Sequence, residues 1–152
     1  MNSTLTWTGE MTMSCENRGL ISVFDATPDH GGQDKGPTPK EMLLNSMSAC
    51  SAMDVVSIAK KMRLPLTSLK IHAEADKTTT TPSYFSEVRT KYYAEGDIDA
   101  DKIIKAVTLS MTKYCGVSYM VSLACPIKYE VVLNGKTIFT GQADFHPETT
   151  HG

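Results

Sequence analysis

Residues 36–62 read GPTPKEMLLNSMSACSAMDVVSIAKKM, and this stretch decides the fold. It predicts a long helix that begins at Pro39, because Thr38 supplies a capping hydroxyl, proline suits the first helical position and Glu41 completes a capping box. The helix is expected to end near Arg63, since Pro65 follows. Apolar residues lie on nearly all sides of it, so it is predicted to be the central element of a core or part of a subunit interface.

The segments on either side of this helix predict strands and shorter helices. Residues 4–13 and 19–25 carry the alternation of a β-hairpin whose turn falls at residues 16–19. A second hairpin is expected from residues 66–77 and 84–95, and a final strand from residues 127–133 that ends in a turn at Asn134 and Gly135.

Two further helices are expected between the second hairpin and the final strand. The first is capped by Asp97 or Asp99 and is interrupted around Cys115 and Gly116, after which a short helix follows. Strands and helices are therefore segregated, which predicts the α+β class in one domain spanning residues 1–152. The tail from about residue 141 is expected to be poorly ordered.

Composition narrows the possible functions. The chain has 152 residues, is 41% hydrophobic and carries a net charge of −2, with no basic cluster that would indicate a nucleic-acid partner. No N-terminal signal peptide and no uncharged apolar run typical of a membrane span stand out, so no membrane partner is expected. The expected location is cytoplasmic, where thiols stay reduced unless they are catalytic or sensing.

The chain contains four cysteines, Cys15, Cys50, Cys115 and Cys125. Their irregular spacing, without a CxxC pair, argues against a disulfide framework, and the scattered histidines argue against a zinc site. We therefore expect no metal and no cofactor.

Cys50 and Cys115 lie 65 residues apart in two separate helical stretches, an arrangement that suits one reactive and one resolving thiol. Cys50 is in the middle of a helix in an apolar setting, which also suits a buried core cysteine, and Asp54 one turn away would disfavour its thiolate. Cys115 is predicted to open a helix beside Lys113, which favours a thiolate, although a packing cysteine at a kink fits equally well. Local electrostatics alone would make Cys115 the nucleophile.

Glu41 and Arg18 are the other residues considered for a site. Glu41 is an acid in the first turn of a helix, and most such residues cap the helix or complement its dipole. Arg18 falls in the predicted turn, where a solvated side chain is expected.

The helix sequence quoted above, the later motif KYCGVS at residues 113–118 and the order of elements resemble the OsmC/Ohr family of thiol-dependent peroxidases, and its OsmC-like branch most. The resemblance covers residues 4 to 135. It implies an intertwined homodimer with the long helices buried centrally and the active sites at the subunit interface. It also implies that Cys50 is the peroxidatic cysteine and Cys115 the resolving one, with a hydroperoxide as substrate and an external dithiol as reductant.

The chain departs from the family pattern around the residues that activate the first cysteine. Family peroxidases place an acid ten residues before that cysteine to hold an arginine over the thiolate, whereas here Lys40 has that position and Glu41 follows it. Glu41 is the matching candidate, but Arg18 at its turn does not align with the family arginine, and Gly116 stands where proline is frequent.

These departures leave more than one function open. The first is reduction of organic hydroperoxides by Cys50 and Cys115, for defence against oxidative stress. The second is a non-enzymatic protein that binds a small hydrophobic ligand in an interface pocket, with structural cysteines. The third, a redox sensor, has no docking or DNA-binding motif to support it.

Overall fold

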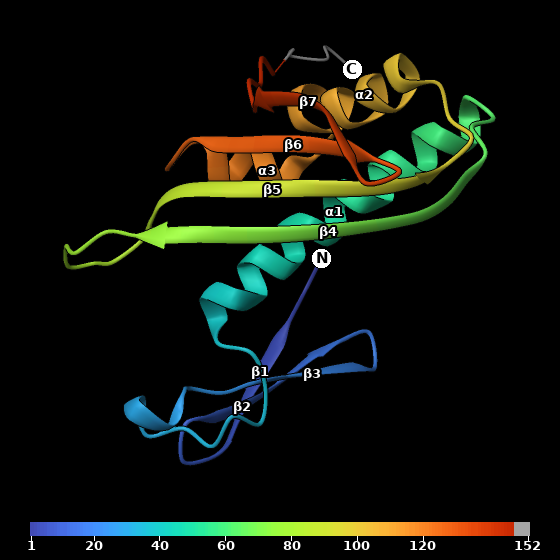
Figure 1. Cartoon of the computed structure of the whole chain (residues 1–152). Coiled ribbons are helices and arrows are strands. Elements are labelled where there is room, and N and C mark those ends of the chain that lie inside the picture. The colour runs from blue at the N-terminus through green and yellow to red at the C-terminus, as the bar shows by residue number, and fades with distance from the viewer. Residues whose placement is uncertain (148–152) are drawn as a thin grey trace. The chain divides into compact units, whose positions relative to one another are not determined.

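The computed structural model describes residues 1–147, which form two compact units that meet in sequence at Asn45 and Ser46 (Figure 1). The single domain expected over residues 1–152 stays a prediction. Of the tail expected to be poorly ordered from about residue 141, residues 148–152 lie outside the described residues.

The first unit holds an antiparallel sheet of three strands, β1 (Thr4–Gly9), β2 (Thr12–Asn17) and β3 (Leu20–Phe24), in that order. The single strand predicted over residues 4–13 is wrong, because the chain turns at Glu10, whose φ of 48° is left-handed. The turn predicted at residues 16–19 is confirmed: Arg18 and Gly19 both have positive φ, and Arg18 is exposed as expected.

Helix α1 (Pro39–Lys61) begins with the predicted capping box. The backbone N–H and the hydroxyl of Thr38 donate to Glu41 Oε2 at 2.7 and 2.9 Å, and the Glu41 N–H donates back to Thr38 Oγ1 at 3.4 Å. The helix ends as expected, since Arg63 takes a left-handed φ of 54° that stops the helical path.

By length and composition alone, α1 is long and apolar enough to cross a membrane. The expectation that no segment of the chain has this character is therefore wrong. The core helix of a globular protein meets the same criterion, so this composition is weak evidence of a membrane partner.

The second unit holds a mixed sheet of four strands, β4 (Leu66–Lys77), β5 (Phe85–Gly96), β6 (Ile127–Leu133) and β7 (Lys136–Gln142). The pairs β4–β5 and β6–β7 are antiparallel, whereas β5 and β6 are parallel and are joined through the helices between them. Strand β7 was missed by the sequence analysis, although the turn at Asn134 and Gly135 before it was expected.

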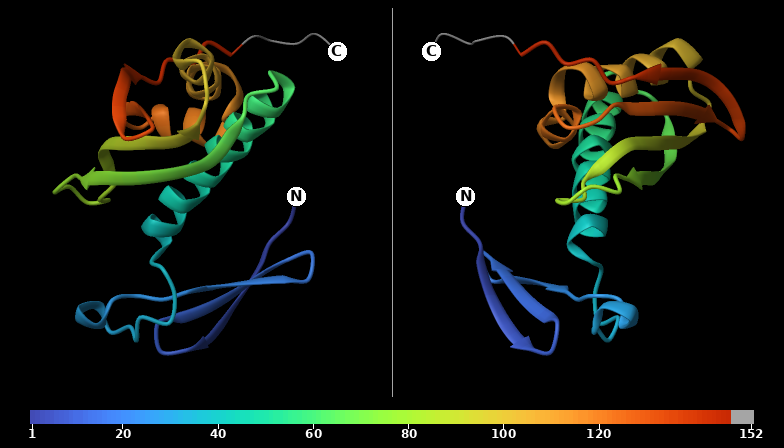
Figure 2. Two further views of the ribbon diagram at one scale, coloured as in Figure 1. Left: turned by 45° about the vertical axis from the view of Figure 1, so that its right-hand side comes forward. Right: turned by 90° about the vertical axis from the view of Figure 1, so that its left-hand side faces the viewer.

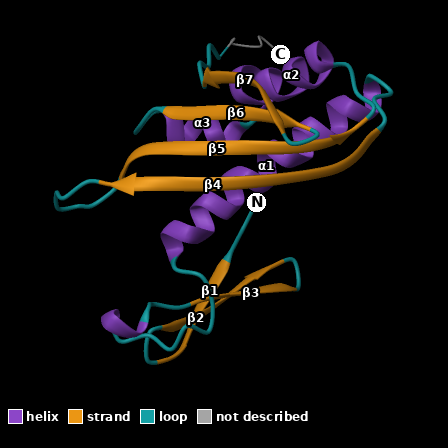
Figure 3. Cartoon of the chain, in the orientation of Figure 1, coloured by secondary structure: helices purple, strands orange, loops and turns teal. Residues whose placement is uncertain are grey.

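The remaining helices follow the prediction closely (Figure 3). Helix α2 (Ala100–Leu109) runs into a π-helical turn, η2 (Ser110–Tyr114), and α3 (Gly116–Ser122) starts after an extended Cys115. In the second unit the helices lie on one face of the four-stranded sheet, as the further views show (Figure 2). The α+β class is confirmed, and the helix break brings Cys115 over α1.

Asp99, one of the two predicted caps, caps α2. Its Oδ1 accepts from the backbone N–H groups of Asp101 and Lys102 at 3.0 and 3.2 Å. The change Asp99→Ala is expected to lower the free energy of unfolding by about 1 kcal/mol, because both N–H groups lose this acceptor. Urea unfolding measures the loss. The matched control is exposed Asp97→Ala, and an equal loss in both variants would contradict the assignment.

Candidate functional site

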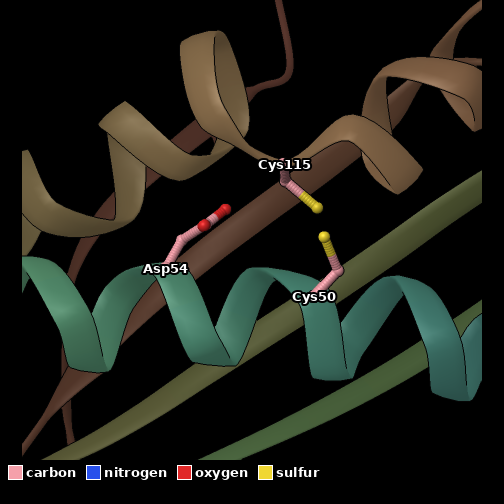
Figure 4. A group of neighbouring side chains, drawn as sticks. All are labelled: Cys50, Asp54 and Cys115. Carbon is pink, nitrogen blue, oxygen red and sulfur yellow. The ribbon is translucent and has the colours of Figure 1, made fainter.

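The second unit brings the sulfur atoms of Cys50 and Cys115 together. Cys50 projects from the middle of α1 and Cys115 from the junction of η2 and α3, with their thiols facing each other (Figure 4). The two sulfurs and the nearest carboxylate oxygen of Asp54 all lie within 4.8 Å of one another. Both thiols are free; Cys50 is partly exposed, whereas the exposed fraction of Cys115 is 0%.

Cys115 caps α3 with its sulfur. Its Sγ accepts from the Ser118 N–H at 3.3 Å and from the Ser118 hydroxyl at 3.0 Å. Burial nevertheless raises the pKa of the Cys115 thiol, and it outweighs the two Ser118 donors, which lower that pKa. A hydrogen bond to Cys50 and the charge of a Cys50 thiolate raise it further.

The expectation from local electrostatics, that Cys115 is the thiol favoured as thiolate, is therefore wrong. The predicted position at a helix N-terminus is confirmed, but a short helix with two donors does not compensate for complete removal from water. Cys115 is held protonated, which suits a thiol that acts second.

Asp54 is the acidic residue that is grouped with the two thiols. It lies one turn after Cys50 on the same face of α1, and its Oδ2 accepts from the Ser110 hydroxyl at 3.1 Å. Partial burial raises the pKa of the Asp54 carboxyl, and the Ser110 hydrogen bond opposes that rise. The neighbour of the thiols in this unit is thus a carboxyl group.

A chain of buried hydroxyls extends from Asp54 into the core. Ser110 Oγ lies 2.8 Å from Ser51 Oγ, which lies 2.6 Å from the Tyr92 hydroxyl, and the Tyr92 hydroxyl oxygen lies 3.1 Å from Met111 Sδ. Burial raises the pKa of Tyr92, so its hydroxyl stays protonated across the physiological range. Every polar atom of this chain has a partner, as burial requires.

Removing the Tyr92 hydroxyl should lower the stability of the fold. Tyr92→Phe is expected to lower the free energy of unfolding by about 1 to 2 kcal/mol, because it deletes a buried hydrogen bond to Ser51. Chemical denaturation gives the value. Tyr93→Phe, in the next residue with 37% exposure, is the matched control and should change stability by less than about 0.5 kcal/mol. Equal losses of stability in the two variants would mean that the buried hydroxyl chain does not stabilise the fold.

Glu41 and Arg18, together with Lys40, belong to the first unit. The capping role of Glu41 is confirmed by its bonds to Thr38, and its catalytic role stays a prediction. The other two cysteines have different hydrogen-bond partners. Cys15 Sγ is 2.9 Å from Ser3 Oγ, and the buried Cys125 thiol donates to Val121 O.

Cys50, Asp54 and Cys115 are also a set of side chains able to hold a metal ion. Two sulfurs and one carboxylate are one ligand short of a tetrahedral structural zinc site, and no fourth histidine, cysteine or acid among the described residues joins the set, so we assign it no metal. Sequence spacing could not indicate this set, because Cys115 comes from a distant segment.

A cavity of about 520 Å³ adjoins the Cys115 segment of the second unit. Its lining is mixed, with apolar Leu109, Tyr119 and Phe145 beside Lys113 and His146. The rings of Tyr119 and Phe145 meet edge to face, with centroids 5.8 Å apart. The cavity has the size and lining of a site for a small organic molecule.

The residues that support the two thiols were not predicted from the sequence. Asp54 was noticed only as an unfavourable neighbour of Cys50, although the spacing of four already placed the two side chains on one helix face. Ser110 and Ser118 gave no signal, because small polar residues in helices are common. Their role depends on the π-helical turn, a feature often found at functional sites.

The fold and the paired thiols define an α+β protein with a two-cysteine site. Residues 32–130 match the family model described as OsmC-like protein, and the chain belongs to the OsmC-like family. It is 31% identical to Protein YhfA of Escherichia coli K12 over 135 residues, which cover 87% of this chain and 98% of that protein.

Solved structures agree with this assignment. A hypothetical protein from Aquifex aeolicus VF5 is 30% identical, with a TM-score of 0.75 over 88% of this chain and 96% of that one. An organic hydroperoxide resistance protein, OsmC, from Legionella pneumophila is 14% identical, with a TM-score of 0.68 over 86% of this chain and 95% of that one. At this identity the second likeness shows the shared fold.

Proposed function

We propose that the protein reduces organic hydroperoxides with Cys50 as the peroxidatic and Cys115 as the resolving cysteine. The observation that carries the proposal is the facing pair of free thiols, within 4.8 Å, one partly exposed and one fully buried. An exposed thiol meets the peroxide first, and a buried neighbour can then close a disulfide. Relatives of the same fold that are named organic hydroperoxide resistance proteins support the choice of substrate.

The reaction has three balanced steps. The Cys50 thiolate attacks one peroxide oxygen, the O–O bond breaks, and the alkoxide takes a proton and leaves as the alcohol. The Cys50 sulfenic acid then condenses with the Cys115 thiol, which forms the S–S bond and releases water. An external dithiol reduces this disulfide by thiol–disulfide exchange and returns both cysteines to thiols. The cycle needs no metal or other cofactor, and a reducing cytoplasm suits it.

Steady-state peroxide consumption tests this function. Reduced protein with a dithiol should consume cumene hydroperoxide with saturation kinetics and consume it faster than hydrogen peroxide, because the substrate is organic. Turnover should stop after about one equivalent of peroxide when the dithiol is replaced by a thioether, which cannot reduce the disulfide. Consumption no faster than that by the dithiol alone would contradict the proposal.

We also propose a homodimer. Only 22% of the most apolar part of α1 is buried within one chain, and Met53 of α1 is 72% exposed. Leu123 after α3 is 71% exposed, and the first unit exposes Trp7 at 68%. Apolar surface of this extent is typical of subunit interfaces. Light scattering should give twice the chain mass, Met53→Glu should shift it toward one chain, and a monomeric wild-type protein would contradict the dimer.

The 520 Å³ cavity favours a second candidate, binding of a small hydrophobic ligand without catalysis. Native mass spectrometry of the purified protein separates the two functions. A retained lipid-like ligand that Leu109→Lys removes, together with no turnover of peroxide, would favour this candidate over the peroxidase. We expect Glu41 to contribute to peroxide reduction and not to ligand binding. Glu41→Gln should therefore lower peroxide turnover and leave ligand retention unchanged.

A further inference from the structure

Asp54 has no evident structural reason to stand beside two thiols. Among residues 1–147 its hydrogen-bond partner is the Ser110 hydroxyl, and no ion pair involves it. A carboxylate there adds a charge to a partly buried site, and this burial raises the pKa of Asp54. Burying a carboxylate without a charged partner lowers the stability of the fold, so its presence points to a role in the chemistry of the site.

The resolving step needs a proton acceptor. Cys115 must lose its proton to attack Cys50, yet it is fully buried and its thiol is held protonated. Its Ser118 contacts are donors to the sulfur and cannot accept that proton. The Cys115 thiol also donates to Met47 O at 3.9 Å, but a backbone carbonyl is too weak a base to take the proton. Within the described part of the second unit, the Asp54 carboxylate lies within 4.8 Å of the Cys115 sulfur and can act as the base.

We propose that Asp54 accepts the Cys115 proton in the resolving step and passes it to the hydroxide that leaves Cys50. This inference rests on the proposed function, because the Cys50 sulfenic acid forms only if the protein reduces hydroperoxides. The Cys115 sulfur attacks the Cys50 sulfur, the S–S bond forms, the S–O bond breaks, and the electron pair leaves with the hydroxide. Asp54 takes one proton from sulfur and returns it to that oxygen as water, so it is unchanged at the end of the step.

The hydroxyl chain orients this carboxylate. Because Ser110 donates to Asp54 Oδ2, the Ser51 hydroxyl is left to donate to Ser110, and both serines are fully buried. One oxygen of Asp54 is thereby fixed on Ser110, which leaves the other free to face the thiols. Figure 4 shows the Asp54 side chain rising from α1 toward the Cys115 segment.

Within the described part of the second unit, few titratable groups are linked to Asp54 by proximity or hydrogen bonds. They are Cys50 on α1, Cys115 at the end of η2, and Tyr92 on β5 through the two serines. Tyr92 stays neutral because burial raises its pKa, and Lys113 on η2 is exposed to solvent. The pH dependence of the resolving step should therefore report Asp54 and Cys115.

The test separates the two thiols without using a peroxide. In a Cys15→Ser, Cys125→Ser background, 4,4′-dithiodipyridine should form a mixed disulfide with Cys50 and release one thiopyridone. Attack by Cys115 then releases the second thiopyridone, so the two rates are read from one absorbance trace. Asp54→Asn is the test variant because its side-chain oxygen can still accept from Ser110, and Asp54→Glu restores the carboxylate.

At neutral pH, Asp54→Asn should slow the second release by about 10²-fold, the usual contribution of a positioned base. The first release should stay within a few-fold of the parent or become faster. The rate of the second release in Asp54→Asn should rise with pH, because hydroxide then removes the Cys115 proton in place of the carboxylate. Asp54→Glu should recover part of the lost rate. Ser110→Ala should slow the second release less than Asp54→Asn does.

Two results would overturn the role of Asp54. One is an unchanged second release in Asp54→Asn, and the other is an equal slowing of both releases, which indicates a general structural defect. A protein that resolves the mixed disulfide with this dependence on Asp54 but consumes no hydroperoxide would contradict the peroxidase and leave the proton-acceptor role intact.

Discussion

Replacing Cys50 with serine is expected to abolish the reduction of organic hydroperoxides, by about three orders of magnitude or more, as for loss of a catalytic nucleophile. A serine hydroxyl at this place on α1 is not ionised near neutral pH and cannot accept a peroxide oxygen. The buried Cys115 cannot replace it, because its thiol is held protonated and is 0% exposed. Coupled peroxide consumption measures the loss.

The control for this prediction is Cys125→Ser. Cys125 is also a buried free cysteine, but its thiol donates to Val121 O within its own segment. This variant should keep its activity, since it has no part in the thiol pair. If Cys50→Ser retained substantial turnover, the assignment of the peroxidatic cysteine would be wrong.

Replacing Cys115 with serine is expected to separate the first step from the rest of the cycle. Without dithiol, the variant should consume about one equivalent of peroxide in its fast phase, because the Cys50 sulfenic acid has no partner thiol. Excess peroxide should then convert Cys50 to the sulfinic acid, seen as a mass gain of about 32 Da in its peptide. Dimedone added during the first turnover should trap the sulfenic acid.

The wild-type protein is the control for over-oxidation of Cys50. Wild-type protein under the same excess should show little sulfinic acid, because closure of the disulfide competes with further oxidation. Equal over-oxidation of both proteins would mean that Cys115 does not resolve Cys50.

Much of the fold could be predicted from the sequence because its signals are local. Thr38 and Glu41 specify the start of α1, Asp99 the start of α2, and Gly116 the break before α3. Strand β7 was missed because its sequence directly follows an expected turn near the chain end, and its pairing with β6 is a tertiary contact.

The site was less predictable, for a physical reason. The identity of both cysteines was visible, but the ionisation of Cys115 depends on burial, which no local pattern reports. In the same way, the link from Asp54 to Ser110 joins residues 56 positions apart. The part of the chemistry that depends on long-range packing therefore had to come from the structure.

The central claim, that Cys50 and Cys115 act as one redox pair, is tested most directly by mass spectrometry of the oxidised protein. Fully reduced protein is treated with one equivalent of cumene hydroperoxide, alkylated and digested without reduction. The account predicts a peptide pair joined by a Cys50–Cys115 disulfide, about 2 Da lighter than its two thiols, with Cys15 and Cys125 alkylated. Consumption of the peroxide with no such pair, or with disulfides that involve Cys15 or Cys125 instead, would contradict it.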